Sequence, residues 1–410
     1  MIIRILNGNL LDTETMSLVG ERHITLSEDR IVDVSESLPT GHADLTIDVR
    51  GQKVLPGFID GHVHHVITTM NFAKLVKMSP VEQALSMGKL AEATVSRGFT
   101  TVRDTGGHTT GLVRAIGSGL CNGPRIIRSG RAISQTGGHG DVAVALEAGL
   151  CACQVLSNDF SHVADGPDAV RGAVRHELRD GSQFIKLMTS GGVASPTDPF
   201  ECVQYTPEEV RAATVETDHR NTYATAHAYQ PEAISLAIEN GVRCIEHGNL
   251  VDAETAARMA ELKVTMVPTL VTYRAMADIG AKLGLPERNV SKNRGVFESG
   301  QRSIEVARQA GVELGFGTDL LGEAQTWQNR EFQIRAELEP ARDVLDAMYR
   351  VNPKLCGLEG EIGRIVPGAF ADLVVTDIDP LENLAALADP EKTLSAVISN
   401  GQPIRNDFAS

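Results

Sequence analysis

Three of the chain's twelve histidines stand within the six residues of DGHVHH, which runs from Asp60 to His65. This stretch follows the apolar run VLPGFI, which is typical of a buried strand. Side chains two apart project from the same face of a strand, so His62 and His64 are expected to point together. Two imidazoles at this spacing can bind one metal ion. Such a pair also arises by chance, so a metal site needs further ligands from elsewhere in the chain.

Four other apolar stretches also carry a side chain that can bind metals or move protons. These are Lys186 in QFIKLMTSGG, His227 in YATAHAY, His247 in CIEHGNL and Asp319 in LGFGTDL. Each has an ordinary alternative, because a core histidine is usually only hydrogen-bonded and an aspartate after a strand often caps a helix or forms a turn. We favour a functional role for Asp319, since a metal-bound water needs a carboxylate to orient it and accept its proton.

Lys186 has apolar neighbours on both sides, in a stretch that should be a buried strand. An ammonium group is costly to bury unless it is paired or loses its proton. Alternatively, its long stem carries the charge out to solvent or to a carboxylate. Because histidines and an aspartate converge on it, we favour a neutral amine that captures CO2. The resulting carbamate offers two oxygens and a negative charge with which to bridge two divalent ions.

The middle of the chain alternates apolar, strand-like stretches with segments of helical periodicity, such as PDAVRGAVRHELRDG and TPEEVRAATVETDHRN. The strand-like stretches are VLPGFIDGHVHH, FTTVRDTGG, RIIRSGRAI, FIKLMTSGG, YATAHAY, CIEHGNL, VTMVPTL and LGFGTDL. Eight such alternations predict an α/β fold, a (β/α)8 TIM barrel. Active sites of these barrels lie at the carboxyl ends of the strands, where the side chains named above would meet. A doubly wound open sheet is the alternative architecture.

Both ends of the chain contain short strand-like runs that have no room for a core of their own. They include IIRILNG and LTIDVRGQKVLPG at the start, and GRIVPGAFADLVVTD and LSAVISNGQPI at the end. We therefore expect residues 1–57 and 360–410 to form one small β-sandwich domain, and residues 58–359 to form the catalytic barrel.

The net charge of −15 argues against a nucleic acid or an anionic membrane as partner, since either would require a basic surface. The amino-terminal residues MIIRILNGNLLD lack the features of a signal peptide, and no apolar stretch is long enough to span a bilayer. The six cysteines are too few and too irregular for a disulfide framework. We expect reduced thiols, including those of Cys151 and Cys153, although this pair also offers a metal site. The expected compartment is the cytoplasm.

Two residues are candidates for polarising a carbonyl group of the substrate. His139 stands in the glycine-rich stretch SQTGGHGD, which would lie over the barrel mouth, and Tyr229 follows His227 on the same face of its strand. A solvated surface histidine is the alternative for His139. The glycines of TSGGV and DTGGHTTG do not match a phosphate-binding loop, so nucleotide binding is not expected.

Taken together, FIDGHVHH, FIKLMTSGGVASPTDP, AHAY, IEHGN, FGTD and the tail GRIVPGAFADLVV resemble the amidohydrolase superfamily. Within it, the chain is similar to the imidazolonepropionase-related branch, which includes Xaa-Pro dipeptidases (prolidases) and other carboxypeptidase-like enzymes. The resemblance covers essentially the whole chain. Imidazolonepropionase itself resembles a mononuclear member that lacks a bridging lysine, so Lys186 argues against that activity.

The resemblance implies a centre of two divalent metal ions, usually zinc, with a carbamylated lysine and a hydroxide between them. The implied ligands are His62, His64 and Asp319 for the first ion, His227 and His247 for the second, and Lys186, carbamylated by CO2, for both. All of these positions hold the expected residue types.

The function we infer is metal-dependent hydrolysis of an amide bond in a small, carboxylate-bearing substrate: an Xaa-Pro dipeptide or an N-acyl amino acid. Asp319 would pass a proton from the attacking hydroxide to the departing nitrogen. Arg131 and Arg274 are candidates for binding the substrate carboxylate. The alternatives are a cyclic-amide hydrolase of the imidazolonepropionase type and a catalytically inactive scaffold. Many relatives form multimers, so a homo-oligomer is expected.

Overall fold

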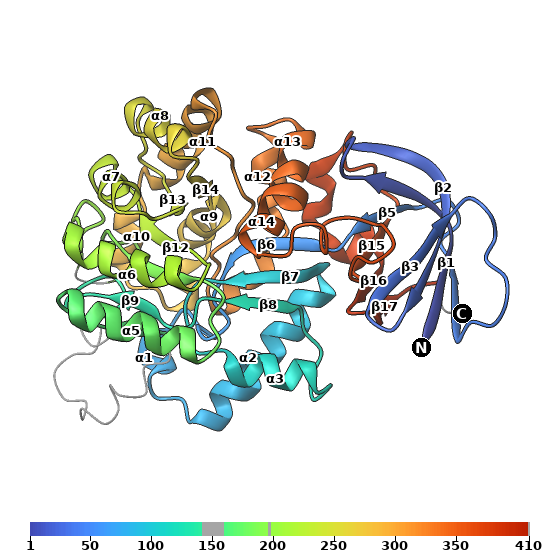
Figure 1. Ribbon diagram of the computed structural model, residues 1–410, viewed down its shortest axis with the longest axis horizontal. Helices are drawn as coiled ribbons and strands as arrows, with labels where there is room; N and C mark the ends of the chain where they lie inside the picture. The colour runs from blue at the N-terminus through green and yellow to red at the C-terminus, as the bar shows by residue number, and fades with distance from the viewer. Residues whose placement is uncertain (142–159, 196–197, 409–410) are drawn as a thin grey trace.

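The computed structural model describes residues 1–141, 160–195 and 198–408. It has two parts, an α/β barrel and a β-sheet that both chain ends build (Figure 1). The prediction of a barrel with a small β domain made from both termini is therefore confirmed. The exact boundaries proposed for the two domains stay a prediction. None of the described helices is long and apolar enough to span a bilayer.

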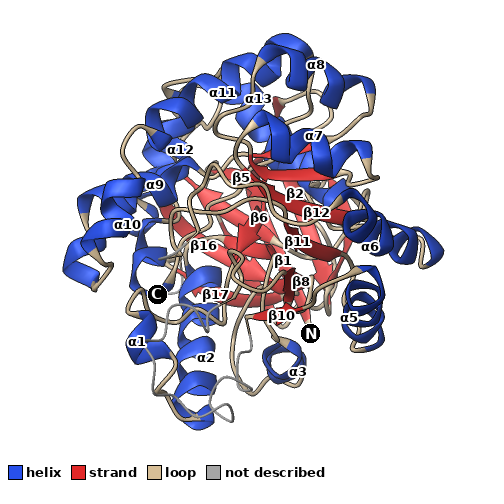
Figure 2. Cartoon of the chain, turned by 90° about the vertical axis from the view of Figure 1, so that its left-hand side faces the viewer, coloured by secondary structure: helices blue, strands red, loops and turns tan. Residues whose placement is uncertain are grey.

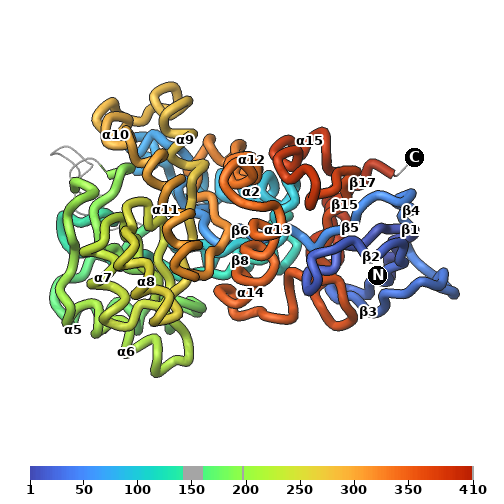
Figure 3. Tube along the Cα trace, turned by 90° about the horizontal axis from the view of Figure 1, so that it is seen from above, coloured from blue at the N-terminus to red at the C-terminus, as the bar shows by residue number. Residues whose placement is uncertain are grey.

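The sheet at the chain ends, called here the terminal sheet, has eight strands in the order β17-β16-β15-β5-β1-β2-β3, with β4 paired to β1. Its strands are β1 (Ile2–Asp12), β2 (Ser17–Ser27), β3 (Arg30–Ser35), β4 (Leu45–Asp48), β5 (Lys53–Pro56), β15 (Leu373–Thr376), β16 (Leu394–Ser399) and β17 (Gln402–Asn406). The two chain ends meet where β15 pairs antiparallel with β5. Figure 3 shows both ends of the chain in this part of the molecule.

The barrel strands are parallel, and helices surround them (Figure 2). The strands of this part are β6 (Phe58–Val63), β7 (Phe99–Asp104), β8 (Arg125–Arg128), β9 (Ala132–Ser134), β10 (Ser161–Val163), β11 (Ile185–Met188), β12 (Ala224–Ala228), β13 (Cys244–His247) and β14 (Thr265–Val267). They form one sheet of the order β6-β7-β8 and a second of the order β10-β9-β11-β12-β13-β14. The third predicted strand, RIIRSGRAI, is thus divided into β8 and β9.

The two segments of helical periodicity named above form α5 and α6, and α2 and α6 each begin with a capping box. The α-helices are α1 (Phe72–Leu75), α2 (Pro80–Ser96), α3 (Thr110–Gly117), α5 (Pro167–Arg179), α6 (Pro207–His219), α7 (Pro231–Glu239), α8 (Ala253–Glu261), α9 (Leu270–Asp278), α10 (Glu287–Lys292), α11 (Val296–Ala310), α12 (Arg330–Ala336), α13 (Ala341–Asp346), α14 (Asn352–Leu355) and α15 (Pro390–Thr393). Shorter helical turns are η2 (Gly280–Leu283), η3 (Gly322–Trp327), η4 (Ala347–Val351) and η5 (Leu384–Ala388).

The eighth predicted strand, LGFGTDL, closes the barrel without forming a regular strand. Its backbone joins β6 through bonds from Gly61 N to Phe316 O (2.7 Å) and from Asp319 N to His62 O (2.8 Å). A Cβ atom on Gly317 would lie 2.9 Å from the Cβ of His62, so only glycine permits this approach. This closure carries Asp319 to the end of β6, next to the two histidines.

Candidate active site

His62, His64 and Asp319 form the tightest group of possible metal ligands at the barrel mouth. Asp319 Oδ1 lies 3.3 Å from His62 Nε2 and 3.1 Å from His64 Nε2. The two Nε2 atoms are 3.2 Å apart. One ligand atom from each of the three residues lies within 4.8 Å of the other two. Such a set of two imidazoles and a carboxylate fits a divalent transition metal.

Glu246 lies behind His62 and fixes its orientation. Its Oε2 is 2.7 Å from His62 Nδ1, and its Oε1 pairs with the guanidinium of Arg103 on β7. Burial raises the pKa of Glu246, but Arg103 and His62 outweigh this and hold it well below its usual range. A carboxylate that accepts the Nδ1–H of His62 leaves Nε2 as the nitrogen that can bind a metal ion.

His227 and His247 stand on the neighbouring strands β12 and β13, with ring centroids 4.7 Å apart. The His247 ring is 4.9 Å from that of His62, and its Nδ1 is 2.8 Å from Thr269 Oγ1 and 3.9 Å from Asp319 Oδ2. His227 Nε2 is 3.1 Å from the carbonyl oxygen of Gly191. Burial lowers the pKa of both histidines well below its usual range, so they are neutral imidazoles, the form that binds metals.

Lys186 on β11 is only 1% exposed, and its side chain lines the same cavity. It takes no part in any hydrogen bond or ion pair with the side chains that the structure describes. Burial lowers the pKa of Lys186 to about 8, although Glu246 and Asp319 oppose this shift. At pH 7, about a tenth of the side chain is then the neutral amine that carbamate formation requires, far more than for a lysine in water.

Two of these residues have backbone conformations that are rare for side chains other than glycine. The φ angles are 72° at His247 and 51° at Asp319. A left-handed residue of this kind costs about 1–3 kcal/mol and persists where its surroundings fix it. Here the backbone N–H of Gly248 donates to Ala228 O and that of Asp319 donates to His62 O. The barrel thus holds both side chains over the mouth at a cost in stability.

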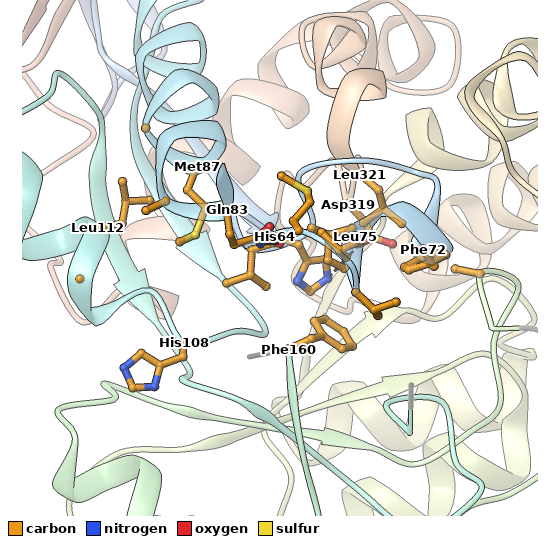
Figure 4. Close-up of a pocket in the computed structure, with 18 of the residues that line it drawn as sticks. His64, Phe72, Leu75, Gln83, Met87, His108, Leu112, Phe160, Asp319 and Leu321 are labelled. Atoms are coloured by element: carbon orange, nitrogen blue, oxygen red, sulfur yellow. Dashed lines mark hydrogen bonds and ion pairs between the residues drawn. The ribbon is translucent and has the colours of Figure 1, made fainter. Parts of the chain in front are cut away.

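The six candidate ligands line one cavity of about 900 Å³ (Figure 4). The figure shows His64 and Asp319 on one side of it, with Phe160 below them and Met87 and Leu112 farther out. Much of the remaining wall is apolar and comes from α1, α2, α3, α9 and adjacent turns. It includes Phe72, Leu75, Val76, Met78, Met87, Leu112, Met276 and Leu321.

His139 also lines this cavity, and its ring stacks on that of His227 with centroids 4.3 Å apart. Its Nδ1 is 2.8 Å from Ser195 Oγ and 3.2 Å from Asp198 Oδ2, which fix the ring. Tyr229 lies beside the candidate metal ligands His227 and His247 and not on the described cavity wall; its ring stacks on that of His247 at 5.5 Å. The hydroxyl of Tyr273 donates to that of Tyr229 at 3.0 Å.

The structure does not bring the two predicted arginines to the cavity wall as far as it is described. Arg131 pairs with buried Glu177, with 3.6 Å between NH1 and Oε1. Arg274 lies on α9, is 55% exposed and pairs with Asp278. Their predicted role in binding a carboxylate therefore stays a prediction without support from the position of either side chain. Cys151 and Cys153 lie outside the described residues.

Three charged residues that hold the site in place were not predicted: Asp60, Arg103 and Glu246. Asp60 accepts hydrogen bonds from His62 N at 3.0 Å and from Thr318 Oγ1 at 2.6 Å, so it ties β6 to the closing segment. All three stand within apolar, strand-like stretches and are fully buried. Because a buried charge is costly, these three residues stand out in the sequence for the same reason as Lys186.

Comparison with known proteins matches this geometry to one family. A model of the amidohydrolase family covers residues 53–404. A prolidase crystallised with N-methylphosphonate-L-proline is 42% identical, with a TM-score of 0.93 over 99% of this chain and 100% of the other. A Xaa-Pro dipeptidase with methionine bound in its active site is 29% identical, with a TM-score of 0.85 over 98% and 99%. Ochratoxinase from Aspergillus niger is 28% identical over 351 residues, 82% of this chain and 73% of the relative.

These matches confirm the resemblance to amidohydrolases and prolidases that the sequence motifs indicated. The family model spans most of the chain, including all six candidate ligands. The chain belongs to the amidohydrolase family and is thus a hydrolase that acts on carbon–nitrogen bonds.

Proposed function

We propose that this chain hydrolyses the amide bond of a small substrate that carries a carboxylate, such as an Xaa-Pro dipeptide or an N-acyl amino acid. The observation that carries the proposal is the convergence of a buried lysine, neutral imidazoles and a carboxylate on one cavity. The prolidase and the Xaa-Pro dipeptidase that share its fold support the same class of substrate.

Two divalent ions, with zinc as our choice, would be held at this cavity. The proposed ligands are His62, His64 and Asp319 for one ion, His227 and His247 for the other, and carbamylated Lys186 for both. When bound, such ions activate water at neutral pH and polarise a carbonyl group. Lys186 fits the bridging role because its amine is buried beside the ligands and burial outweighs the stabilisation of its ammonium form by Glu246 and Asp319.

The side chains of this chain would move the protons of the reaction. Asp319 is more exposed than the imidazoles around it, with 16% of its side chain accessible, so a carboxylate oxygen can face the substrate. It would take the proton of the attacking water and deliver it to the departing nitrogen, because an amine is a poor leaving group as an anion. His139 lines the same cavity and would donate a hydrogen bond to the carbonyl oxygen.

We propose that the apolar wall of the cavity holds the group on the acyl side of the bond. Phe72, Leu75, Met78 and Met276 favour an aliphatic or aromatic group over a charged one. We therefore expect substrates such as Met-Pro or Phe-Pro, or an amino acid with an apolar acyl group, to be cleaved faster than Asp-Pro or Lys-Pro.

The test is a substrate panel with purified protein loaded with zinc. It should contain Xaa-Pro dipeptides, N-acyl amino acids, their carboxamide analogues, lactams and aminated nucleobases, with Asp319→Asn as the inactive control. Hydrolysis of the free acids, and much slower hydrolysis of the carboxamides, is the expected result. Turnover of only lactams or nucleobases would assign the chain to cyclic-amide hydrolases or deaminases, and a protein without bound metal or turnover would be a scaffold.

A further inference from the structure

A second group of metal-binding side chains lies away from the described cavity wall, between β10 and α5. His162 belongs to β10, His176 and Glu177 to α5, and one ligand atom of each lies within 4.8 Å of the other two. Asp180 follows the last turn of α5, with Oδ2 3.7 Å from His176 Nδ1. Two imidazoles and one carboxylate therefore lie together between a strand and a helix, and a second carboxylate lies next to one of the imidazoles.

The distances within this group are too long for hydrogen bonds and suit a shared ion. Glu177 Oε1 lies 3.5 Å from His162 Nδ1 and 3.5 Å from His176 Nδ1. Hydrogen bonds between such atoms are about 2.7–3.2 Å long. In a tetrahedral zinc site, bonds of about 2.0–2.1 Å place neighbouring ligand atoms about 3.3–3.4 Å apart. An ion between these atoms would need only small side-chain movements.

Two atoms of the group are also left without a hydrogen bond in the interior. Glu177 is 1% exposed, yet its Oε1 and the Nδ1 of His176 are buried without a hydrogen-bond partner among the residues described. Among the described residues, Oε1 has ion-pair contacts of 3.5–3.6 Å with His162, His176 and Arg131, and a buried carboxylate oxygen without a hydrogen bond is costly. The other oxygen, Oε2, accepts the backbone N–H of Arg131 at 3.1 Å, which leaves Oε1 as the atom that can bind an ion.

Several positively charged side chains lie close to the group in the described part of the chain. Arg131 NH1 is 3.6 Å from Glu177 Oε1, Arg179 Nε is 3.4 Å from Asp180 Oδ1, and the guanidinium of Arg128 donates to the backbone carbonyl of Asp180. The spacing of the ligand atoms, and not the net charge of the group, therefore indicates a bound ion. We propose that His162, His176 and Glu177, with Asp180 as the fourth ligand, bind a structural zinc ion that links β10 to α5.

Zinc counting on the full chain tests this proposal. The unmodified protein, His162→Ala, His176→Ala and a control, His42→Ala, are titrated with zinc chloride in competition with a chelator. His42 is exposed and lies 3.2 Å from Asp44, so the control removes a histidine beside a single carboxylate. We expect His162→Ala and His176→Ala to bind one zinc ion per chain fewer than the other two proteins. This difference does not depend on how many ions the barrel cavity holds, nor on which substrate is cleaved.

A second readout is the thermal midpoint in the presence of zinc. Zinc should raise the midpoint of the unmodified protein and of His42→Ala more than that of the two variants, because binding to the folded state stabilises it. Equal zinc counts and equal shifts in all four proteins would overturn the proposal and leave the group as a network of ion pairs. If either alanine variant does not fold, Asp180→Asn replaces it, because the Asp180 side chain is 27% exposed and its loss is better tolerated. This variant should also bind one zinc ion per chain fewer.

Discussion

The interior of the barrel and the core of the terminal sheet bury different kinds of side chain. The core of the terminal sheet is apolar, built around residues such as Ile24 and Val54. The barrel also has large apolar clusters, but it buries Arg103, Lys186 and Glu246 completely at the strand ends. Burial of charge costs free energy, whereas burial of an aliphatic side chain gains it. The terminal sheet thus contributes stability, and the barrel mouth gives some up to hold a reactive site.

Two of the buried cations in the barrel, Arg103 and Lys186, also differ from each other. The ion pair with Glu246 outweighs the effect of burial on Arg103, which stays charged, whereas burial lowers the pKa of Lys186 to about 8. Arg103 remains charged and supports His62 through Glu246, whereas Lys186 can lose its proton. Substitutions in each region test this difference between the barrel mouth and the terminal sheet.

The largest effect is expected for Lys186→Ala. Hydrolysis should fall by more than about 100-fold and bound metal should decrease, because even the loss of a group that only supports a ligand costs 10–100-fold. The thermal midpoint without added metal should not fall, since a buried amine is removed. Activity and metal content are measured together, and short carboxylic acids should restore part of both. Unchanged metal content would refute the bridging role of this lysine.

Glu246→Gln should harm both function and stability. Metal affinity or activity should fall by about 10–100-fold as His62 loses its carboxylate. The free energy of unfolding should fall by about 3–5 kcal/mol, because Arg103 is left as an unpaired buried charge. Urea unfolding measures the second effect. The double variant Arg103→Met with Glu246→Gln should regain stability but not activity. If it regains neither, the functional and the stabilising roles of the pair cannot be separated.

Ile24→Ala in the terminal sheet should affect stability alone. Removal of this fully buried side chain should cost about 2–5 kcal/mol in the free energy of unfolding. The kcat and KM of the folded enzyme should stay those of the unmodified protein when assayed well below the thermal midpoint. Val32→Ala, at a residue that is 48% exposed, is the matched control with little effect on either. A selective loss of kcat in Ile24→Ala would contradict the division between the two regions.

Tyr229→Phe should have the smallest effect. Its hydroxyl accepts a hydrogen bond from Tyr273, and a neutral hydrogen bond contributes about 0.5–1.5 kcal/mol, which limits the loss in kcat/KM to about 10-fold. The stacking on His247 is retained in the variant. A loss larger than that of Glu246→Gln would instead place the hydroxyl in direct contact with the substrate.

Much of this architecture could be predicted from the sequence because strand patterns and polar residues at strand ends are local signals. His62 and His64 share a strand face by spacing alone, and the helix starts at α5, α6 and α7 carry proline in the first turn. Closure of the barrel by LGFGTDL could not be predicted in detail, since it depends on glycine contacts with β6. The sequence also could not show that Arg131 is held by Glu177, because that contact joins residues far apart in the chain.

The pairing of β15 with β5 has a consequence for how the protein is made. Because β5 ends at Pro56 and β15 begins at Leu373, β5 leaves the ribosome long before its partner, and this sheet is complete only after the barrel between them has been made. Pairing across such a sequence separation is slow, because the entropy of closing the loop is lost before any contact is gained. During synthesis the exposed edge of β5 would be a preferred binding site for chaperones.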